Sequence, residues 1–304
     1  MIFIAYHPSY ELELPRGHRF PMDKYPMLKK QLLYEGTFSN ENFFLPKKID
    51  RNIVEKVHNK NYVQKLVTLS LNKSEIRRIG FPFNKKLIER EMTIAGGTLQ
   101  CCIKAFENGI SLNVAGGTHH AFSNRGEAFC LLNDQAIAAQ YLINEYKLKK
   151  ILIIDLDVHQ GNGTAEIFRK NKKVFTFSMH GEKNYPFQKI KSDLDVELID
   201  GTEDQQYLDI LNEKLNMIFE KIKPEFIFYL AGVDILKTDK LGRLSMTLEG
   251  CRLRDEIILN RCLERKIPVQ CSMGGGYSEE LKIILEAHSN TFRIASKIFQ
   301  NIGT

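Results

Sequence analysis

The segment Asp155-Leu-Asp-Val-His159 places three residues that can bind a metal at alternating positions. In an extended chain, residues two apart project to the same face, so Asp155, Asp157 and His159 point together. A carboxylate and an imidazole that converge in this way offer an oxygen and a nitrogen to a divalent cation. Asp234 follows small apolar residues, where an unpaired carboxylate would be costly without a cation, so it is the expected third ligand. Three protein ligands and a water predict an open catalytic zinc site.

The same segment has a structural alternative. Asp155 and Asp157 can cap a helix that begins near Gly161-Asn-Gly-Thr164, because aspartate, asparagine and threonine are common helix N-caps. The complete pattern D-x-D-x-H-x-G-N-G, with Asp234 downstream, is far less expected by chance than one D-x-D pair. The metal site is therefore the favoured interpretation. A nucleotide site at 161–164 is disfavoured, because no P-loop lysine follows.

Two further clusters can supply catalytic groups. His119 and His120 follow a Gly-Gly pair, which permits the sharp turn that two adjacent residues need to face one site. Paired histidines in such a place can act as general bases for a water that the metal activates. Tyr277 follows three glycines, and its phenol can donate a hydrogen bond to a developing oxyanion. By itself, Gly-Gly-Gly-Tyr is a weak signal.

Short apolar runs alternate with longer amphipathic segments, the pattern of an α/β fold with a mostly parallel sheet. Strands are predicted over residues 110–114, 151–156, 174–177, 226–230 and 269–272. Helices are predicted over residues 86–108, 133–147, 204–222, 248–265 and 279–301. The Gly96-Gly97 pair costs stability inside the first helix, so another backbone is expected to approach it closely.

Each predicted strand leads into a polar or glycine-rich cluster. The five clusters lie at residues 116–120, 155–159, 178–180, 231–234 and 274–277. In open α/β sheets, ligands bind outside the carboxyl ends of the strands. Five strands therefore deliver their polar groups to one side of the sheet, which predicts an active site there.

Composition limits the function classes that remain. The 304 residues are 43% hydrophobic and 26% charged, which are globular values. The net charge is +6, but the lysines are spread along the chain, so no direct nucleic-acid binding is expected. No apolar run is long enough for a membrane span, and the start lacks the features of a signal peptide. Six cysteines without a C-x-x-C pair predict free thiols in a reducing compartment.

In combination, these motifs resemble the signature of the zinc-dependent histone deacetylase superfamily. The matching blocks occur in the usual order as G-G-T-H-H-A (116–121), G-E-A-F-C-L-L-N-D (126–134), D-L-D-V-H-Q-G-N-G-T (155–164), A-G-V-D (231–234), D-K-L-G-R-L-S-M-T (239–247) and G-G-G-Y (274–277). The start, with H-P-S-Y and L-P-R-G-H-R-F-P-M-D-K-Y within residues 7–25, is similar to the class IV branch (histone deacetylase 11-like) and its bacterial relatives. The resemblance spans the chain and implies the arginase–deacetylase fold, a parallel sheet flanked by helices. With no linker in the sequence, one catalytic domain over residues 1–304 is expected.

The resemblance implies individual catalytic roles. Asp157, His159 and Asp234 would bind one zinc ion. His120 would be the general base, with His119 as its partner, either a proton donor or an electrostatic helper. A further residue, Tyr277, would polarise the scissile carbonyl.

Supporting roles follow from the same resemblance. Asp155 would orient the first histidine and, with Ser178 and nearby backbone carbonyls, hold a potassium ion. Asn162 lies where some branches place an aspartate behind the second histidine, and its neutral side chain should leave that histidine less prone to protonation. Substrate-binding residues would be Phe129, Tyr185 and Gly275, with the two aromatic rings as opposite walls of the channel for the lysine side chain.

The implied reaction is hydrolysis of Nε-acyl-lysine in a protein or peptide by metal-activated water. The chain departs from many family members at Ala128, where they have glycine, and this change is expected to narrow the channel. The loop Gly80-Phe-Pro82 lacks the acidic residue that other branches use to grip the substrate backbone. Class IV relatives differ in the same way and are associated with long acyl groups as well as acetyl. We expect a cytoplasmic location, or a nuclear one in a eukaryotic host; substrate, acyl length and oligomeric state stay open.

Three other functions compete with this prediction. Acetylpolyamine or other small-amide amidohydrolases share the motifs, but a small cationic substrate would need acidic gating residues that the sequence does not place. A two-manganese ureohydrolase of similar fold would need a further carboxylate after Asp234, where Ile235 and Leu236 stand. A non-catalytic acyl-lysine binder would be expected to lack a ligand, a base or the tyrosine, and all of these are present.

Overall fold

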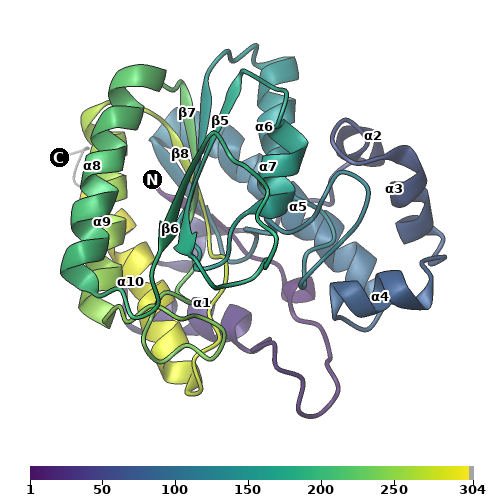
Figure 1. Cartoon of the computed structure of the whole chain (residues 1–304). Helices are drawn as coiled ribbons and strands as arrows, with labels where there is room; N and C mark the ends of the chain where they lie inside the picture. Colours follow the sequence, from purple (N-terminus) through teal and green to yellow (C-terminus); the bar gives the residue numbers. More distant parts are fainter. Residues whose placement is uncertain (301–304) are drawn as a thin grey trace.

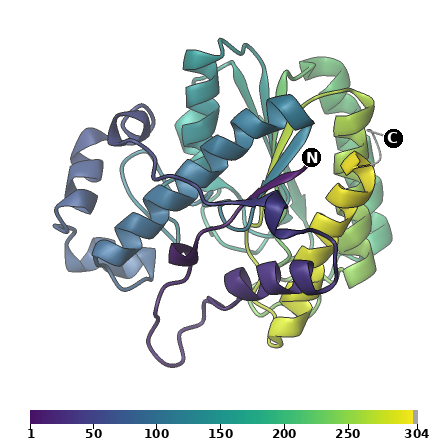
Figure 2. The ribbon, with the colours of Figure 1, turned by 180° about the vertical axis from the view of Figure 1, so that it is seen from behind.

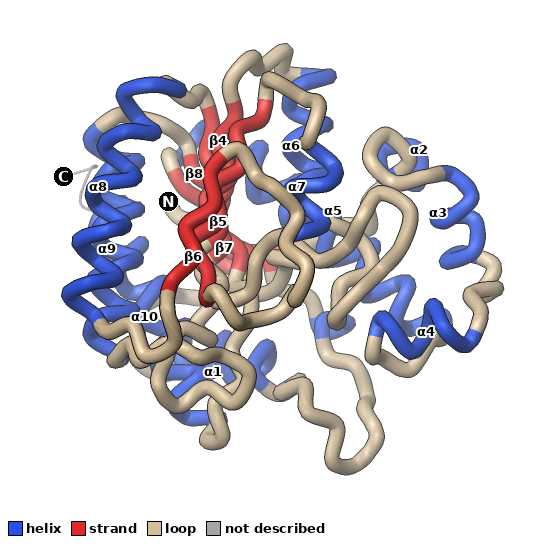
Figure 3. Tube along the Cα trace, in the orientation of Figure 1, coloured by secondary structure: helices blue, strands red, loops and turns tan. Residues whose placement is uncertain are grey.

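The fold is centred on one parallel sheet of eight strands, in a computed structural model that describes residues 1–300. The strand order is β2-β1-β3-β8-β7-β4-β5-β6, and every neighbouring pair is parallel. Figure 3 shows the strands in red at the centre of the molecule, with the helices in blue around them. The strands are β1 Phe3–Ala5, β2 Phe43–Phe44, β3 Ile110–Asn113, β4 Ile151–Asp155, β5 Val174–Gly181, β6 Leu194–Leu198, β7 Phe226–Leu230 and β8 Val269–Ser272. All residues of β3, β4, β7 and β8 are buried, as expected for parallel strands covered on both faces.

Helices cover both faces of this sheet. They are α1 Lys24–Tyr34, α2 Arg51–Val54, α3 Lys60–Val67, α4 Lys73–Ile79, α5 Lys85–Asn108, α6 Asp134–Glu145, α7 Asn162–Phe168, α8 Asp204–Ile222, α9 Leu248–Glu264 and α10 Leu281–Phe299, with short 3-10 turns at Pro8–Tyr10 and Asn40–Asn42. Helices α8, α9 and α10 lie on one side of the sheet, and α5, α6 and α7 lie on the other (Figures 1 and 2). Helices α2, α3 and α4 lie outside α5, at the edge of the molecule.

The sequence predicted the centre of the sheet and missed its edges. The five predicted strands are β3, β8, β7, β4 and β5, which are consecutive neighbours in the sheet. The predicted helices correspond to α5, α6, α8, α9 and α10, within two residues at each described end. The last residue of the predicted helix over 279–301 lies outside the described residues. Strands β1, β2 and β6 were not predicted, because the first two are very short and the third is mostly half-exposed.

The glycine pair in α5 meets close neighbours, as predicted. A Cβ on Gly96 would lie 2.0 Å from the backbone oxygen of Lys47. A Cβ on Gly97 would lie 2.4 Å from the hydroxyl of Tyr10, which is a side chain rather than a backbone. The long helix therefore packs closely on the N-terminal segment that adds strands β1 and β2 to the sheet.

All six cysteines are free and buried, in agreement with the prediction of free thiols. Among residues 1–300, no helix is both long and apolar enough to cross a membrane.

Candidate active site

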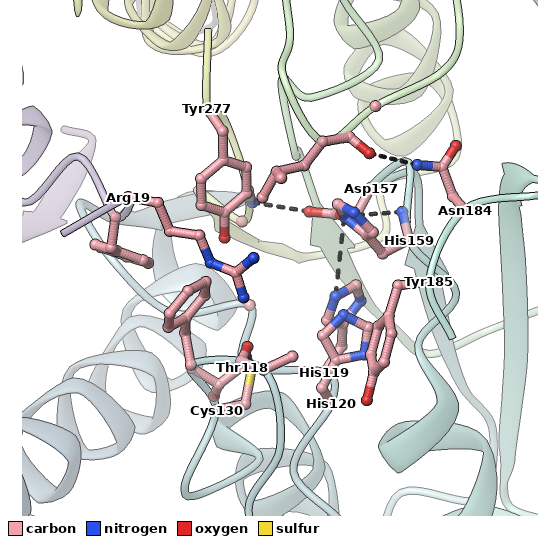
Figure 4. Close-up of a pocket in the computed structure, with 18 of the residues that line it drawn as sticks. Arg19, Thr118, His119, His120, Cys130, Asp157, His159, Asn184, Tyr185 and Tyr277 are labelled. Carbon is pink, nitrogen blue, oxygen red and sulfur yellow. Dashed lines mark hydrogen bonds and ion pairs between the residues drawn. The ribbon is translucent and has the colours of Figure 1, made fainter. Parts of the chain in front are cut away.

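Asp157, His159 and Asp234 meet at the carboxyl end of the sheet, as the sequence predicted (Figure 4). One ligand atom from each lies within 4.8 Å of the others, and all three side chains are buried. His159 Nδ1 lies 3.0 Å from Asp157 Oδ1 and 3.1 Å from Asp234 Oδ2. Within residues 1–300, this is the one group of three or more histidine, cysteine or acidic residues that could hold a metal ion.

The loop after β4 presents two of these side chains. The backbone amide of Val158 donates to Asp234 Oδ1 at 2.9 Å, and that of His159 donates to Asp157 Oδ1 at 3.0 Å. These bonds fix the orientation of the carboxylates before any ligand binds. Helix α7 begins after this loop with Gly161 as its N-cap, and no side chain caps it. The alternative that Asp155 and Asp157 serve as helix caps is therefore wrong.

Gly275 packs directly against both carboxylates. Its amide donates to Asp157 Oδ2 at 2.8 Å. A Cβ at this position would lie 2.0 Å from Asp234 Oδ2 and 2.8 Å from Asp157 Oδ2. Only glycine lets the chain pass this close to the pair. Gly275 lines the pocket and shapes the carboxylate pair, and its predicted contact with a substrate stays a prediction.

The electrostatics of Asp157, His159 and Asp234, called the trio below, favour a bound cation. Burial, and then the charge of Asp157, raise the pKa of Asp234 to about 7. Burial would lower the pKa of His159, but hydrogen bonds to Asp157 and Asp234 outweigh it and raise that pKa to about 10. Two buried carboxylates thus compete for one positive partner. Two carboxylate oxygens and an imidazole nitrogen are a donor set that zinc accepts, so the residues present fit a zinc ion.

His119 and His120 lie beside this trio, each bonded to a different partner. His119 Nδ1 lies 2.7 Å from Asp155 Oδ2, and His120 Nδ1 lies 2.7 Å from Asn162 Oδ1. A carboxylate only accepts, and the Asn162 oxygen also accepts from the Gly163 amide, so both histidines donate through Nδ1. Nε2 of His120 is left as an acceptor, whereas Nε2 of His119 lies 3.9 Å from Asp157 Oδ1. The two rings are tilted by 47° with their centroids 4.1 Å apart, so their charges interact directly.

Different partners shift the pKa values of His119 and His120 in opposite directions. Burial disfavours the cation in both rings, but the charges of Asp155 and then Asp157 outweigh it and raise the pKa of His119 to about 9. Burial, followed by repulsion from His119 and His159, holds the pKa of His120 well below its usual value. Near neutral pH the pair therefore offers one protonated and one neutral imidazole, which is the arrangement that an acid and a base need.

Asp134 organises the turn that carries both histidines, and the sequence analysis gave it no role. Its carboxylate accepts from the amides of Gly117 and Thr118 at 3.2 and 2.9 Å, and from the Thr118 and Thr98 hydroxyls at 2.7 and 2.6 Å. Gly116 adopts φ +81°, and a Cβ there would lie 2.3 Å from the same carboxylate. The D in the G-E-A-F-C-L-L-N-D block was the available signal.

Tyr277 stands over the site on the opposite side from the histidines (Figure 4). Asp239 accepts a 2.6 Å hydrogen bond from its backbone amide and also binds the amides of Leu241 and Gly242. Burial, and then the charges of Asp157 and Asp234, raise the pKa of the phenol well above its usual value. The phenol therefore stays protonated and can donate a hydrogen bond.

Lys24 and Arg254 are buried cations that the sequence analysis did not assign to the site. Lys24 Nζ donates to the carbonyl of Gly274 at 3.1 Å, beneath the turn that carries Tyr277. Arg254 Nη1 donates to the carbonyls of Leu156 and Gly232, at 3.3 and 2.5 Å. Leu156 immediately precedes Asp157, and Gly232 lies two residues before Asp234, so Arg254 holds the two segments that carry these carboxylates. Sequence gives no local signal for these contacts, because they join distant segments.

Aromatic side chains wall the cavity, which has a volume of about 690 Å³. Phe129 packs edge-to-face with Phe20 at 5.2 Å between centroids, and Phe20 does the same with Tyr277 at 6.0 Å. Tyr185 meets the His120 ring at 4.9 Å, with its hydroxyl donating to Glu127 at 2.6 Å. Both predicted wall residues thus line the cavity, with Tyr185 on the histidine side.

One predicted cluster does not reach the pocket. The sequence placed Ser178 and His180 after a strand that ends at residue 177, but β5 continues to Gly181 and includes both. Ser178 Oγ and His180 Nδ1 are 2.9 Å apart, buried away from the residues that line the cavity. Ser178 pairs with Asp155 in the β4–β5 register. The potassium site stays a prediction.

Comparisons with known proteins show the family to which the chain belongs. A family model described as histone deacetylase domain matches residues 18–292. The chain therefore belongs to the histone deacetylase family. An uncharacterized protein of Picosynechococcus sp. is 42% identical over 296 residues, 97% of this chain and 99% of that protein. Histone deacetylase 2 of Arabidopsis thaliana is 28% identical, covering 96% of this chain and 79% of that protein.

Solved structures share the same fold. The crystal structure of the HDA15 HD domain has a TM-score of 0.83 at 22% identity, covering 97% of this chain and 88% of that chain. A crystal structure of an HDAC homolog complexed with SAHA also has a TM-score of 0.83 at 22% identity, covering 97% and 84%. The arginase–deacetylase fold is confirmed. The class IV assignment stays a prediction, because relatives from several branches match at similar identity.

Proposed function

We propose that the chain is a zinc-dependent lysine deacylase that hydrolyses Nε-acyl-lysine in proteins or peptides. The observation that carries the proposal is the convergence of two carboxylates and an imidazole, two oppositely tuned histidines and a phenol around one cavity. Zinc would be held by Asp157, His159 and Asp234. When bound, zinc supplies a Lewis acid that lowers the pKa of a water and polarises an amide carbonyl.

The chain's own residues supply the proton transfers. His120 is neutral and donates through Nδ1 to Asn162, so its Nε2 can accept a proton from the attacking water. His119 is held protonated by Asp155 and can give a proton to the departing lysine amine. Amide hydrolysis needs both transfers, and the two rings are adjacent, so one pair serves both steps.

Tyr277 supplies the remaining catalytic group in this proposal. Its phenol donates a hydrogen bond to the carbonyl oxygen as negative charge develops there. Phe129 and Tyr185 enclose the aliphatic part of the lysine side chain, because their rings line the cavity between solvent and the trio. A lysine side chain enclosed in this way would displace water from the channel, which strengthens each electrostatic contact within it.

The lining of the cavity argues against an acetylpolyamine substrate. Among the residues that line it, Asp157 is the only carboxylate, and six are arginine or lysine. A polycation would therefore meet repulsion at the mouth. For a ureohydrolase, the chain offers buried Ile235 and Leu236 after Asp234 instead of a further carboxylate.

The direct test is hydrolysis of lysine peptides that carry acyl groups from acetyl to myristoyl, with and without a chelator. We expect turnover that the chelator abolishes and that added zinc restores. The dependence on chain length then measures how far the channel extends. Absence of turnover for every acyl group by the zinc-loaded protein would refute the proposed function.

A further inference from the structure

Basic side chains surround the mouth of the cavity. The exposed ones are Arg19, Arg78, Lys183, Lys240 and Arg243. A sixth, Arg90, also lines the cavity but is buried and paired with Glu91, so it belongs to the interior. The mouth is therefore positive, although the lysines of the whole chain showed no clustering in sequence. The five residues come from four separate segments, which sequence inspection does not bring together.

Within residues 1–300, neither Arg19 nor Arg78 forms a salt bridge, and Glu75, the carboxylate that interacts with the Arg78 charge, is paired with Lys65 at 2.9 Å. The Arg19 guanidinium lies 5.0 Å from the centroid of the Phe129 ring and points towards the pocket (Figure 4). Arg78 lies in the last turn of helix α4, and its carbonyl accepts from the amide of Ala128, next to the same wall. Both positive charges thus stand beside one wall of the channel without a salt bridge to any described residue.

The other three cations are only partly neutralised. Lys183 and Arg243 share one carboxylate, Asp200, at 4.0 and 3.3 Å. Lys240 lies 4.0 Å from Glu279, and both of these side chains are more than half exposed. The segment that carries Lys240 and Arg243 lies beside Asn184 and Tyr185, because the Asn184 side chain donates to the Leu241 carbonyl at 2.6 Å. Lys183 precedes Asn184 in the chain, so all three cations lie together. In Figure 4, Arg19 and Tyr185 lie on opposite sides of the pocket.

We propose that the site selects acyl-lysine in acidic segments of polypeptide, with carboxylates on both sides of the acylated residue. This inference rests on the proposed function and specifies its substrate class. Positive potential at the mouth of a low-dielectric cavity raises the local concentration of anions and repels cations. Because the cations stand on both sides of the mouth, a chain that crosses it meets positive charge before and after the acyl-lysine. A small anion could contact the cations on only one side of the mouth, so a polypeptide segment is the better fit.

The test uses matched peptides in which one acetyl-lysine is flanked on both sides by glutamate, by glutamine or by lysine. Binding to the zinc-loaded full chain is measured by fluorescence anisotropy, and turnover is measured in parallel. Exposed ion pairs are individually weak, so we expect affinity and kcat/KM to fall by about three- to tenfold from glutamate to glutamine, and again to lysine. The differences should shrink at high salt.

Matched variants assign the effect to the mouth. Arg19→Gln with Arg78→Gln should remove most of the preference for glutamate, and Arg19→Lys with Arg78→Lys should retain it. Lys170→Gln with Lys172→Gln is the control, because it removes two positive charges from the exposed loop before β5, at the amino edge of the sheet. An equal loss of preference in this control would overturn the assignment.

The outcomes separate this inference from the proposed function. If the peptides bind in the expected order but none is hydrolysed, the proposed function fails and the charge selection stands. If the glutamine and glutamate peptides bind and react equally well, the inference fails and the proposed function stands. Free Nε-acetyl-lysine that binds as tightly as the glutamate peptide would overturn selection for a polypeptide segment.

Discussion

Replacing Tyr277 by phenylalanine removes one oxygen from the site and leaves the surroundings almost unchanged. Within residues 1–300, the Tyr277 hydroxyl makes no hydrogen bond to another residue, so its loss leaves no protein group unpaired. The ring contacts with Phe20, Phe129 and His159 remain available to phenylalanine. We therefore expect the free energy of unfolding and the zinc content to stay close to those of the parent protein.

The rate of hydrolysis should change strongly. Loss of one donor to a developing oxyanion typically costs about 100- to 1000-fold in kcat, or about 2.7–4 kcal/mol of transition-state stabilisation. Because the bond strengthens only as charge develops, kcat should fall while KM changes little. The raised pKa of the phenol keeps the donor protonated, so the defect should be similar across the accessible pH range.

Steady-state hydrolysis of an acetyl-lysine peptide at several pH values measures this effect, with zinc content determined on the same samples. Tyr141→Phe is the matched control, because Tyr141 lies on α6 and does not line the cavity. Its kcat should equal that of the parent protein. A Tyr277→Phe protein with full zinc and near-normal kcat would refute the role assigned to the phenol.

Three further predictions follow from particular contacts. Asn162→Asp places a negative charge 2.7 Å from His120 Nδ1, so the pKa of His120 should rise by about 1–3 units. The acidic limb of the pH profile of kcat/KM should then shift to higher pH by the same amount, and an unchanged limb would contradict this. Burial lowers the pKa of His58 to about 4, and its Nε2 accepts from the Asn133 amide, so the unfolded state binds the proton first as pH falls. The contribution of His58 to the free energy of unfolding should be fully present above pH 6.5, and up to about 3 kcal/mol of it should be lost as the pH falls to 4. Urea titrations should show a smaller loss in His58→Gln. Gly275→Ala forces a methyl group against both ligand carboxylates, so zinc titration should show affinity at least about tenfold weaker; unchanged affinity would contradict the observed packing.

The parts of the fold that sequence predicts are those with a strong local pattern. Strands β4 and β7 are five-residue runs buried throughout, and their length and apolar character distinguish them from helices. Strand β2 has two residues and β1 has three, which is too short for any periodicity. Strand β5 extends into residues that read as a polar cluster, since burial of Ser178 and His180 is a tertiary property.

The site divides in the same way. His119, Asp157 and Tyr277 stand next to glycines or in alternation, so their chemistry is visible in short motifs. Lys24 contacts the carbonyl of Gly274, 250 residues away, and Arg254 reaches Leu156 across 98 residues. A single sequence contains no signal for such pairs. The supporting cations and the positive mouth therefore appear only when the chain is folded.

Zinc titration of the metal-free protein, with competition from a chelator of known affinity, measures whether Asp157, His159 and Asp234 bind one metal ion. We predict one zinc per chain, and at least about a hundredfold weaker binding in Asp234→Asn, which keeps the size of the side chain and removes its charge. Asp239→Asn, which alters a carboxylate outside the trio, should keep one strong site. Absence of zinc binding by the parent protein, or equal affinity in Asp234→Asn, would contradict the proposed metal site.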